Sequence, residues 1–233
     1  MLKKIYNNLL NFILPNTCLA CDEVMDPGSS YLCTKCNSKL EPYNETHPWQ
    51  ADFINNGTID DSFSVYWFRE GTAIQPLFHA LKYQKIKRAG IMLGEEIGRL
   101  AASKIANNID IIIPVPLHKA KLRDRTYNQS EYIAKGISNI LKTEVISDAV
   151  IRSRFTPTQT RLNKAERKVN VSGAFRINPK YTDKLRGKNI LLADDVITTG
   201  ATILECASAI KSAGSRKLCV CSAAYAELKI NVV

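Results

Sequence analysis

Short unbroken apolar runs alternate along the chain with stretches in which apolar residues recur at helical spacing. Continuous runs suit strands that are buried on both faces, whereas a period of three to four residues suits helices that pack by one side. The expected strands are 63–68, 110–115, 144–151, 173–177, 190–193 and 217–225. The expected helices are 71–83, 91–105, 127–141 and 203–213. This alternation predicts an α/β fold in which helices flank a parallel sheet.

The sequence NILLADDVITTGAT at 189–202 changes from apolar to polar where an expected strand ends. Two adjacent acids, Asp194 and Asp195, come first. A small hydroxyl-rich turn then leads into a helix, and it consists of Thr198, Thr199, Gly200, Ala201 and Thr202. Small residues let backbone N–H groups approach an anion, and a helix N-terminus adds partial positive charge. This turn, the threonine turn below, therefore predicts a phosphate site.

Carboxylates repel phosphate but suit sugar hydroxyls or a hydrated cation. A ribose 5-phosphate would satisfy both the acid pair and the threonine turn. The simpler alternative is that Asp194 and Asp195 end a strand and cap a helix. Two adjacent acids followed by Thr-Thr-Gly-Ala-Thr favour the ligand site.

A second expected strand, 110–115, also ends in a polar loop. Pro114 and Pro116 stop the strand and stiffen its exit, and a basic segment from His118 to Arg125 follows. Such a loop could hold the pyrophosphate arm of a ligand whose 5-phosphate lies in the threonine turn. A solvated basic loop is the alternative. The long polar stretch 152–170 is expected to be a hood that shields the site from water.

Four of the seven cysteines form two Cys-x-x-Cys pairs, namely Cys18, Cys21, Cys33 and Cys36. Two such pairs can surround one tetrahedral ion with four thiolates, the arrangement of a structural zinc site without an open catalytic position. Disulfides or a redox pair are disfavoured alternatives, and an iron–sulfur cluster is the main chemical rival. The remaining cysteines lie among small apolar residues and are expected to be buried; they are Cys206, Cys219 and Cys221.

The net charge of +10 is concentrated between residues 119 and 188, which hold 17 Lys and Arg against 6 Asp and Glu. A phosphate-bearing ligand, either a nucleotide precursor or a nucleic acid, suits such a field. No apolar run approaches the ~20 residues needed to span a bilayer. Residues 1–14 lack a secretory pattern and are expected to form a helix that packs on the body of a cytoplasmic protein. The polar stretch 41–57 is expected to be a linker.

The 189–202 stretch resembles the phosphoribosyl pyrophosphate motif of type I phosphoribosyltransferases. Five segments, in order, resemble the ComF family of competence-associated proteins: the paired Cys-x-x-Cys, HALKYQKIKRAG, IIPVPLH with RTYNQS, TQTRLNKAERKVNVSGAF and ILLADDVITTGAT. The resemblance implies an amino-terminal helix and zinc module with linker at 1–57, and a phosphoribosyltransferase-like domain at 58–233. Thr126 departs from the family, which typically has Gly there, and Thr resists positive φ.

The resemblance also implies roles for individual residues. Asp194 and Asp195 would bind the ribose hydroxyls of phosphoribosyl pyrophosphate, and the threonine turn would bind its 5-phosphate. Magnesium would bridge the ligand. The candidates near pyrophosphate are Leu117, His118 and Arg125. The family is associated with DNA uptake in natural transformation.

Two functions fit these expectations. The first is an enzyme that transfers phosphoribosyl groups, for which the acceptor pocket is not evident in the sequence. The second is a non-catalytic protein that keeps the fold to bind single-stranded DNA or DNA-uptake proteins, with Tyr31 and Tyr43 among its contacts. A zinc-stabilised protein-interaction module is a third possibility.

Overall fold

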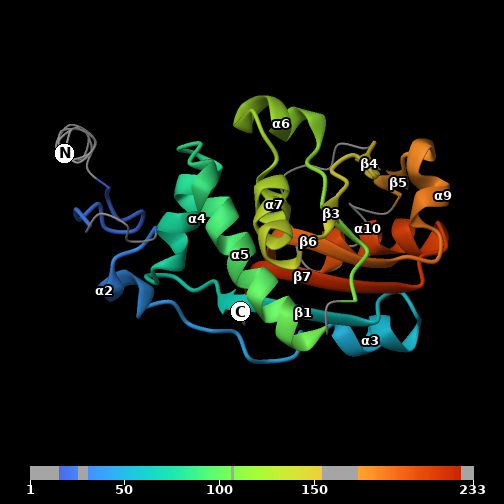
Figure 1. Cartoon of the computed structure of the whole chain (residues 1–233), viewed down its shortest axis with the longest axis horizontal. Helices are drawn as coiled ribbons and strands as arrows, with labels where there is room; N and C mark the ends of the chain where they lie inside the picture. The colour runs from blue at the N-terminus through green and yellow to red at the C-terminus, as the bar shows by residue number, and fades with distance from the viewer. Residues whose placement is uncertain (1–15, 26–30, 106–107, 154–172, 227–233) are drawn as a thin grey trace, which may run out of the picture.

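A five-stranded parallel sheet forms the centre of the molecule, with strand order β1-β7-β6-β2-β3 (Figure 1). The computed structural model describes residues 16–25, 31–105, 108–153 and 173–226. The strands are β1 Asp61–Trp67, β2 Ile111–Pro114, β3 Glu144–Val145, β6 Asn189–Ile197 and β7 Lys217–Tyr225. All four pairings are parallel, so the strands' carboxyl ends meet at one edge of the sheet. The predicted α/β architecture is confirmed.

Helices cover both faces of this sheet (Figure 1). The three helices α4 Ile74–Lys82, α5 Lys87–Lys104 and α7 Gln129–Leu141 pack on one face. The helix α10 Ala201–Ser212 packs on the other. The remaining helical segments are short: α2 Thr34–Asn37, α3 Gln50–Asn55, α6 Lys119–Arg125, η2 Pro179–Tyr181 and α9 Thr182–Leu185. In the described part of the chain, none of the helices has the length and apolar character needed to cross a bilayer.

Successive side chains of β6 enter two different hydrophobic cores. Leu191 and Ala193 pack with α5 and α7, whereas Ile190 and Leu192 pack with α10. All four are fully buried. Since neighbouring strand residues point to opposite faces, a strand covered on both sides needs apolar residues at every position. Burying each large side chain contributes about 2 kcal/mol, which explains the unbroken run in the sequence.

The expected strand 144–151 is divided between two sheets. β3 ends at Val145 and pairs with β2, whereas β4 Val150–Arg152 pairs antiparallel with β5 Phe175–Ile177. Between them Ile146 and Ala149 are buried, so the apolar pattern continues although the chain changes direction. The pattern of apolar residues indicates burial but not which sheet a residue joins. The prediction of one strand over 144–151 was wrong for this reason.

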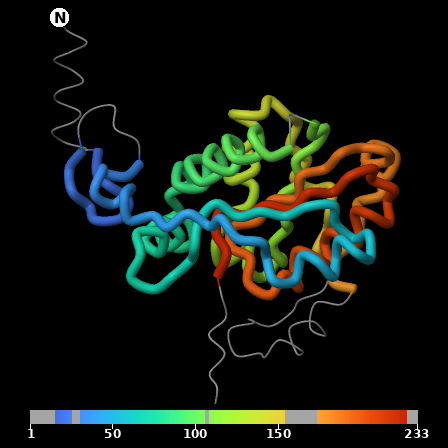
Figure 2. Tube along the Cα trace, turned by 90° about the horizontal axis from the view of Figure 1, so that it is seen from below, coloured from blue at the N-terminus to red at the C-terminus, as the bar shows by residue number. Residues whose placement is uncertain are grey.

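The stretch expected to be a linker is built into the edge of the sheet. The amide of Tyr43 donates to the carbonyl of Val65 at 2.8 Å, and that of Trp67 donates to Glu41 at 2.8 Å. Tyr43 and Trp49 belong to the same core as α10. Figure 2 shows this segment running from the amino-terminal module alongside the sheet to α3. Its aromatic residues thus give the polar stretch a buried side.

Candidate functional site

The acid pair lies inside a strand and not beyond it. β6 was expected to end at Ala193 but continues to Ile197, because β7 is equally long and pairs with it to Tyr225. Ser130 of α7 donates its hydroxyl hydrogen to Asp194 Oδ1 at 3.0 Å. Lys82 Nζ of α4 lies 2.9 Å from Asp195 Oδ2. Two helices on the same face of the sheet therefore hold the two carboxylates.

The threonine turn follows the strand directly. Gly200 has a φ of 76°, a left-handed conformation that glycine adopts without a steric penalty, and it is the residue from which α10 begins. The amide of Ala201 donates to Thr199 Oγ1 at 3.4 Å. The first N–H groups of a helix lack partners within the helix. The start of α10 therefore presents backbone donors at this turn, as expected for an anion site.

A cavity of about 200 Å³ brings the predicted parts together. The acid pair, the threonine turn and Leu117 at the exit of β2 all line it. Four cationic side chains also line the cavity, namely Lys82, Lys121, Arg125 and Arg152. The cations thus outnumber the two acids, and a ligand that combines hydroxyls with several phosphate charges matches this arrangement.

The segment RTYNQS connects the elements of the cavity wall through a series of hydrogen bonds. Tyr127 donates its hydroxyl to the carbonyl of Leu81 in α4. Asn128 caps α7 by accepting from the amide of Ser130 at 3.2 Å. Its side-chain amide donates to Val115 O at 3.0 Å, which holds the β2 exit loop. Gln129 Oε1 accepts from Arg125 at 3.0 Å. The loop, α4 and α7 are therefore joined around the site.

His118, a candidate for contact with pyrophosphate, lies at the start of a short helix. Its Nδ1 accepts from the amide of Ala120 at 3.1 Å, so the ring caps the short helix α6. Leu117 and Arg125 line the cavity, but His118 is not among its lining residues. A pyrophosphate role for His118 thus has less support from the geometry than the roles of its two neighbours.

The neighbours of the two acids separate their pKa values. Burial and the adjacent charge of Asp195 raise the pKa of Asp194 to about 7. Burial acts on Asp195 as well, but the ammonium of Lys82 outweighs it and holds the pKa of Asp195 below its usual value. Burial, then the charges of Arg125 and Arg152, lower the pKa of Lys121. The pair therefore offers one ionised carboxylate and one that titrates near neutral pH.

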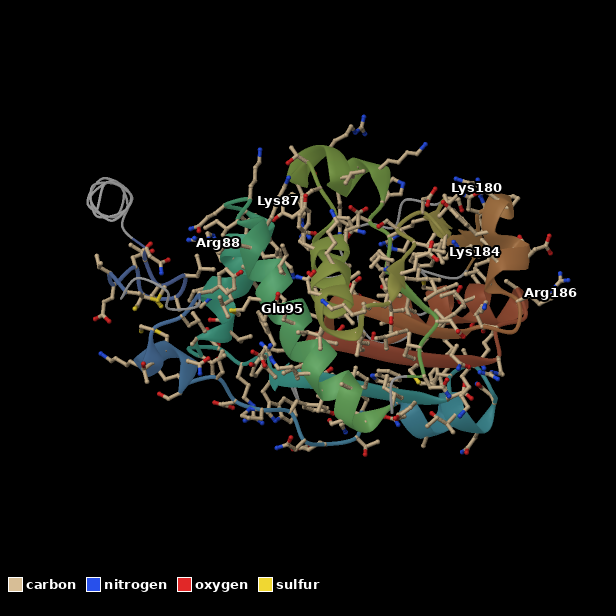
Figure 3. All side chains as sticks on the ribbon, viewed as in Figure 1. Lys87, Arg88, Glu95, Lys180, Lys184 and Arg186 are labelled. Atoms are coloured by element: carbon tan, nitrogen blue, oxygen red, sulfur yellow. The ribbon has the colours of Figure 1, made fainter. Side chains whose placement is uncertain are left out.

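Some cations of the basic segment 119–188 lie away from the cavity. Figure 3 shows Lys180, Lys184 and Arg186 gathered around α9 at one end of the molecule, away from Lys87 and Arg88 at the start of α5. Lys184 pairs with Glu144 at 2.6 Å across the surface. The expected hood, 152–170, has only residues 152 and 153 in the described chain; the rest lies outside it. Among the described residues, Lys180, Lys184 and Arg186 are not part of the cavity lining.

Sequence reasoning missed Lys82, Gln129 and Ser130 as members of the site. Each of these side chains extends from a helix and contacts a predicted site residue. The local sequence pattern around a residue does not reveal such contacts. The available signals were the segments that carry the family resemblance, since Lys82 lies in HALKYQ and Ser130 closes RTYNQS.

The four amino-terminal cysteines form a compact cluster. Their sulfur atoms all lie within 4.8 Å of one another, and the Sγ atoms of Cys21 and Cys33 are 3.7 Å apart. A tetrahedral Zn²⁺ with Zn–S distances of about 2.3 Å would separate its sulfurs by about 3.8 Å. The amide of Cys33 donates to Cys18 Sγ at 3.3 Å, a contact that suits a thiolate. All four cysteines are free, so the geometry fits structural zinc. Cys206, Cys219 and Cys221 are buried as expected.

Two known families match this chain. Residues 9–47 match the Double zinc ribbon domain, and residues 89–229, more than half of the chain, match the Phosphoribosyl transferase domain. The first match contains one set of four cysteines. These matches and the parallel sheet agree with the predicted combination of a zinc module and a phosphoribosyltransferase fold.

Named relatives extend the comparison. A "DNA utilization protein YhgH" of Shigella flexneri is 30% identical over 155 residues, which are 64% of this chain and 66% of that protein. "Competence protein F" of Haemophilus influenzae is 31% identical over 109 residues, 47% of each chain. Among solved structures, the glutamine phosphoribosylpyrophosphate amidotransferase from B. subtilis shares 18% identity and a TM-score of 0.38, covering 56% of this chain and 26% of its own. The fold assignment rests on the sheet and the family match.

Proposed function

The chain belongs to the phosphoribosyltransferase domain family and, within it, to the ComF proteins, and we propose that it binds phosphoribosyl pyrophosphate with magnesium. The observation that carries this proposal is the shared cavity at the carboxyl ends of β6 and β2. An acid pair, an anion-binding turn and several cations line that one cavity. Each matches a different chemical part of the ligand.

The proposed pose follows from charge and hydrogen-bonding capacity. The threonine turn would donate to the 5-phosphate, and Asp194 and Asp195 would accept from the ribose hydroxyls. Arg125 and Lys121 would contact the pyrophosphate, beside the backbone at Leu117. Magnesium supplies positive charge to the pyrophosphate when bound, and the carboxylate oxygens nearby are donors of the kind it prefers. Asp195 keeps Lys82 as a partner, which limits the repulsion between the acids and the phosphates.

Isothermal titration calorimetry with phosphoribosyl pyrophosphate and magnesium tests the proposal. We expect saturable binding to the unsubstituted protein and at least about tenfold weaker binding after Asp194→Asn or Asp195→Asn, equivalent to ~1.4 kcal/mol. Asp183→Asn is the matched control, because the side chain of Asp183 is 95% exposed on α9. If the unsubstituted protein does not bind, or all three variants bind equally, the proposal is wrong.

Two of the relatives carry names that refer to DNA utilization and competence, which supports a role in DNA handling. We propose that this chain also acts in the handling of DNA taken up by the cell. A fold retained only for single-stranded DNA is less favoured. Tyr43, which was expected to contact bases, is buried with 4% exposure and cannot stack on a base. A gel shift with single-stranded DNA over a range of salt concentrations tests any remaining contact, since phosphate-driven binding weakens steeply with salt.

A further inference from the structure

Three flat rings from residues 43–49 form a buried stack beneath the sheet edge. The ring centroids of Tyr43 and His47 are 5.1 Å apart with planes 16° from parallel. Those of His47 and Trp49 are 4.8 Å apart with planes 7° from parallel. All three side chains are at most 7% exposed. Stacked aromatic rings at this spacing attract one another beyond the gain from burial alone.

Two serine hydroxyls of β1 fix the middle ring. His47 Nδ1 lies 2.7 Å from Ser62 Oγ, and Nε2 lies 2.9 Å from Ser64 Oγ. Ser64 Oγ in turn lies 2.6 Å from Ser222 Oγ on β7. Burial lowers the pKa of His47 to about 4, so the ring stays neutral and its nitrogens act as one donor and one acceptor. The stack is thereby anchored to two strands of the central sheet.

The outer ring of the stack contacts the threonine turn. A Cβ atom placed on Gly200 would lie 2.9 Å from both Cδ2 and Cε2 of Trp49 and 2.9 Å from Leu204 Cδ1. The indole therefore lies against the backbone at the point where the chain turns into α10. Gly200 precedes the first residue of α10 and has a φ of 76°. Its backbone conformation therefore sets the direction of the first N–H groups of α10, which lack partners within the helix. Close packing against a rigid ring limits the alternatives open to this glycine.

We infer that Trp49 is a positioning residue for the phosphate-binding turn. It lies in neither of the two regions that match known families, 9–47 and 89–229. Its ring stacks on His47 and lies against the backbone of Gly200, which lines the cavity, whereas Trp49 itself is not among the lining residues. The segment that follows the zinc module is thus part of the ligand site's support. The binding consequence rests on the proposed function, whereas the effect on the turn does not.

Hydrogen exchange measured by mass spectrometry tests the effect on the turn without any ligand. We expect Trp49→Leu to speed exchange at least tenfold in peptides covering residues 198–204, since a smaller side chain leaves Gly200 without its support. Phe53→Leu is the matched control, because Phe53 meets the edge of Trp49 at a centroid distance of 6.3 Å. If exchange in this turn is the same in both variants, the inference is overturned.

Titration with phosphoribosyl pyrophosphate and magnesium then tests the consequence for binding. Trp49→Leu should weaken binding about tenfold through a higher Kd, Phe53→Leu should leave Kd within about twofold, and the flat ring of Trp49→Phe should restore part of the loss. Trp49→Phe also serves if Trp49→Leu fails to fold. Absence of binding by the unsubstituted protein would contradict the proposed function, and the exchange result would still decide the role of Trp49. Equal Kd values in the Leu variants would overturn that role.

Discussion

At the scale of single residues, Thr126 stores backbone strain beside the ligand site. It ends α6 with a φ of 67°, in the left-handed region. A β-branched residue is unfavourable there because its side chain crowds the backbone. Its hydroxyl donates to the carbonyl of Arg125 at 2.6 Å, which offsets part of that cost. The strain lies next to Tyr127 and Asn128, whose contacts hold the cavity wall.

Thr126→Gly should stabilise the protein. The substitution relieves the left-handed strain, but glycine also gains entropy in the unfolded chain. The net effect should raise the free energy of unfolding by about 0.5–1 kcal/mol. Lys142→Gly is the control, because Lys142 ends α7 with a φ of 55° but has no branch at Cβ. Urea unfolding of both variants should show the larger gain at residue 126. Equal gains would mean that the branched side chain adds no strain of its own.

The raised pKa of Asp194 should make ligand binding depend on pH. A carboxylate that accepts from ribose hydroxyls does so best when ionised, and a pKa of about 7 places that ionisation near neutrality. We expect affinity for phosphoribosyl pyrophosphate with magnesium to rise about tenfold from pH ~6 to pH ~8, following the ionised fraction. Calorimetry of Asp194→Asn supplies the control, since its remaining pH dependence belongs to the ligand's own phosphates.

The same shift affects stability with a definite sign. The native pKa of Asp194 lies above the unfolded value of ~3.9, so the native state holds more protons between pH ~4 and pH ~7. This group therefore lowers the free energy of unfolding as pH rises through that window. Asp194→Asn should flatten this dependence in the absence of ligand. A pH profile that the substitution leaves unchanged would contradict the assigned pKa.

At the scale of elements, glycines allow α5 and α7 to cross in close contact. A Cβ on Gly94 would overlap the carbonyl oxygen of Ile133, and one on Gly136 would overlap that of Ile91. Glycine lowers helix propensity, so Gly94 and Gly98 are unfavourable for α5 as an isolated helix. In the structure the glycines let α7 approach α5 closely. This matters for the site, because α7 carries Ser130, which contacts Asp194 in β6.

Gly136→Ala should destabilise the protein although alanine favours helices. A clash with backbone cannot be relieved by a rotamer change, so we expect a loss of about 2–4 kcal/mol in the free energy of unfolding. Gly98→Ala should cost less, because its closest contact, with the Cβ of Ile140, is 2.8 Å, whereas that of Gly136 with the carbonyl oxygen of Ile91 is 2.1 Å. Denaturant unfolding separates the two. Stabilisation of both variants by the intrinsic propensity difference of ~1 kcal/mol would contradict this helix contact.

The elements and the centre of the site could be predicted from sequence because their signals are local. The unbroken run at β6 reports burial on both faces, and the acid pair and threonine turn follow it within one stretch. Lys82 and Trp49 could not be predicted in this way. Each reaches its partner through tertiary packing between segments that are distant in sequence. The 41–57 segment illustrates the same limit, since its polar composition concealed three buried rings.

At the scale of the whole molecule, the zinc module and the domain share one hydrophobic core. Cys18, Met25, Leu32 and Cys36 belong to the same buried cluster as side chains of α4, α5 and α7. Figure 2 shows the module at one end of the molecule, connected to the sheet by the segment that carries Trp49. Loss of its internal order would therefore expose apolar surface on the domain as well.

Removing the metal should lower the stability of the entire chain. Elemental analysis should find one zinc per chain, and Cys36→Ser should abolish it while lowering the free energy of unfolding by about 2 kcal/mol or more. Cys206→Ala is the control, because this buried cysteine lies outside the cluster. Its substitution should lower the free energy of unfolding without loss of zinc. Thermal unfolding followed by the circular dichroism of the helices reports on the domain. If zinc is lost from Cys36→Ser and the midpoint of that transition does not move, the module is energetically separate and the shared core contributes nothing to the domain.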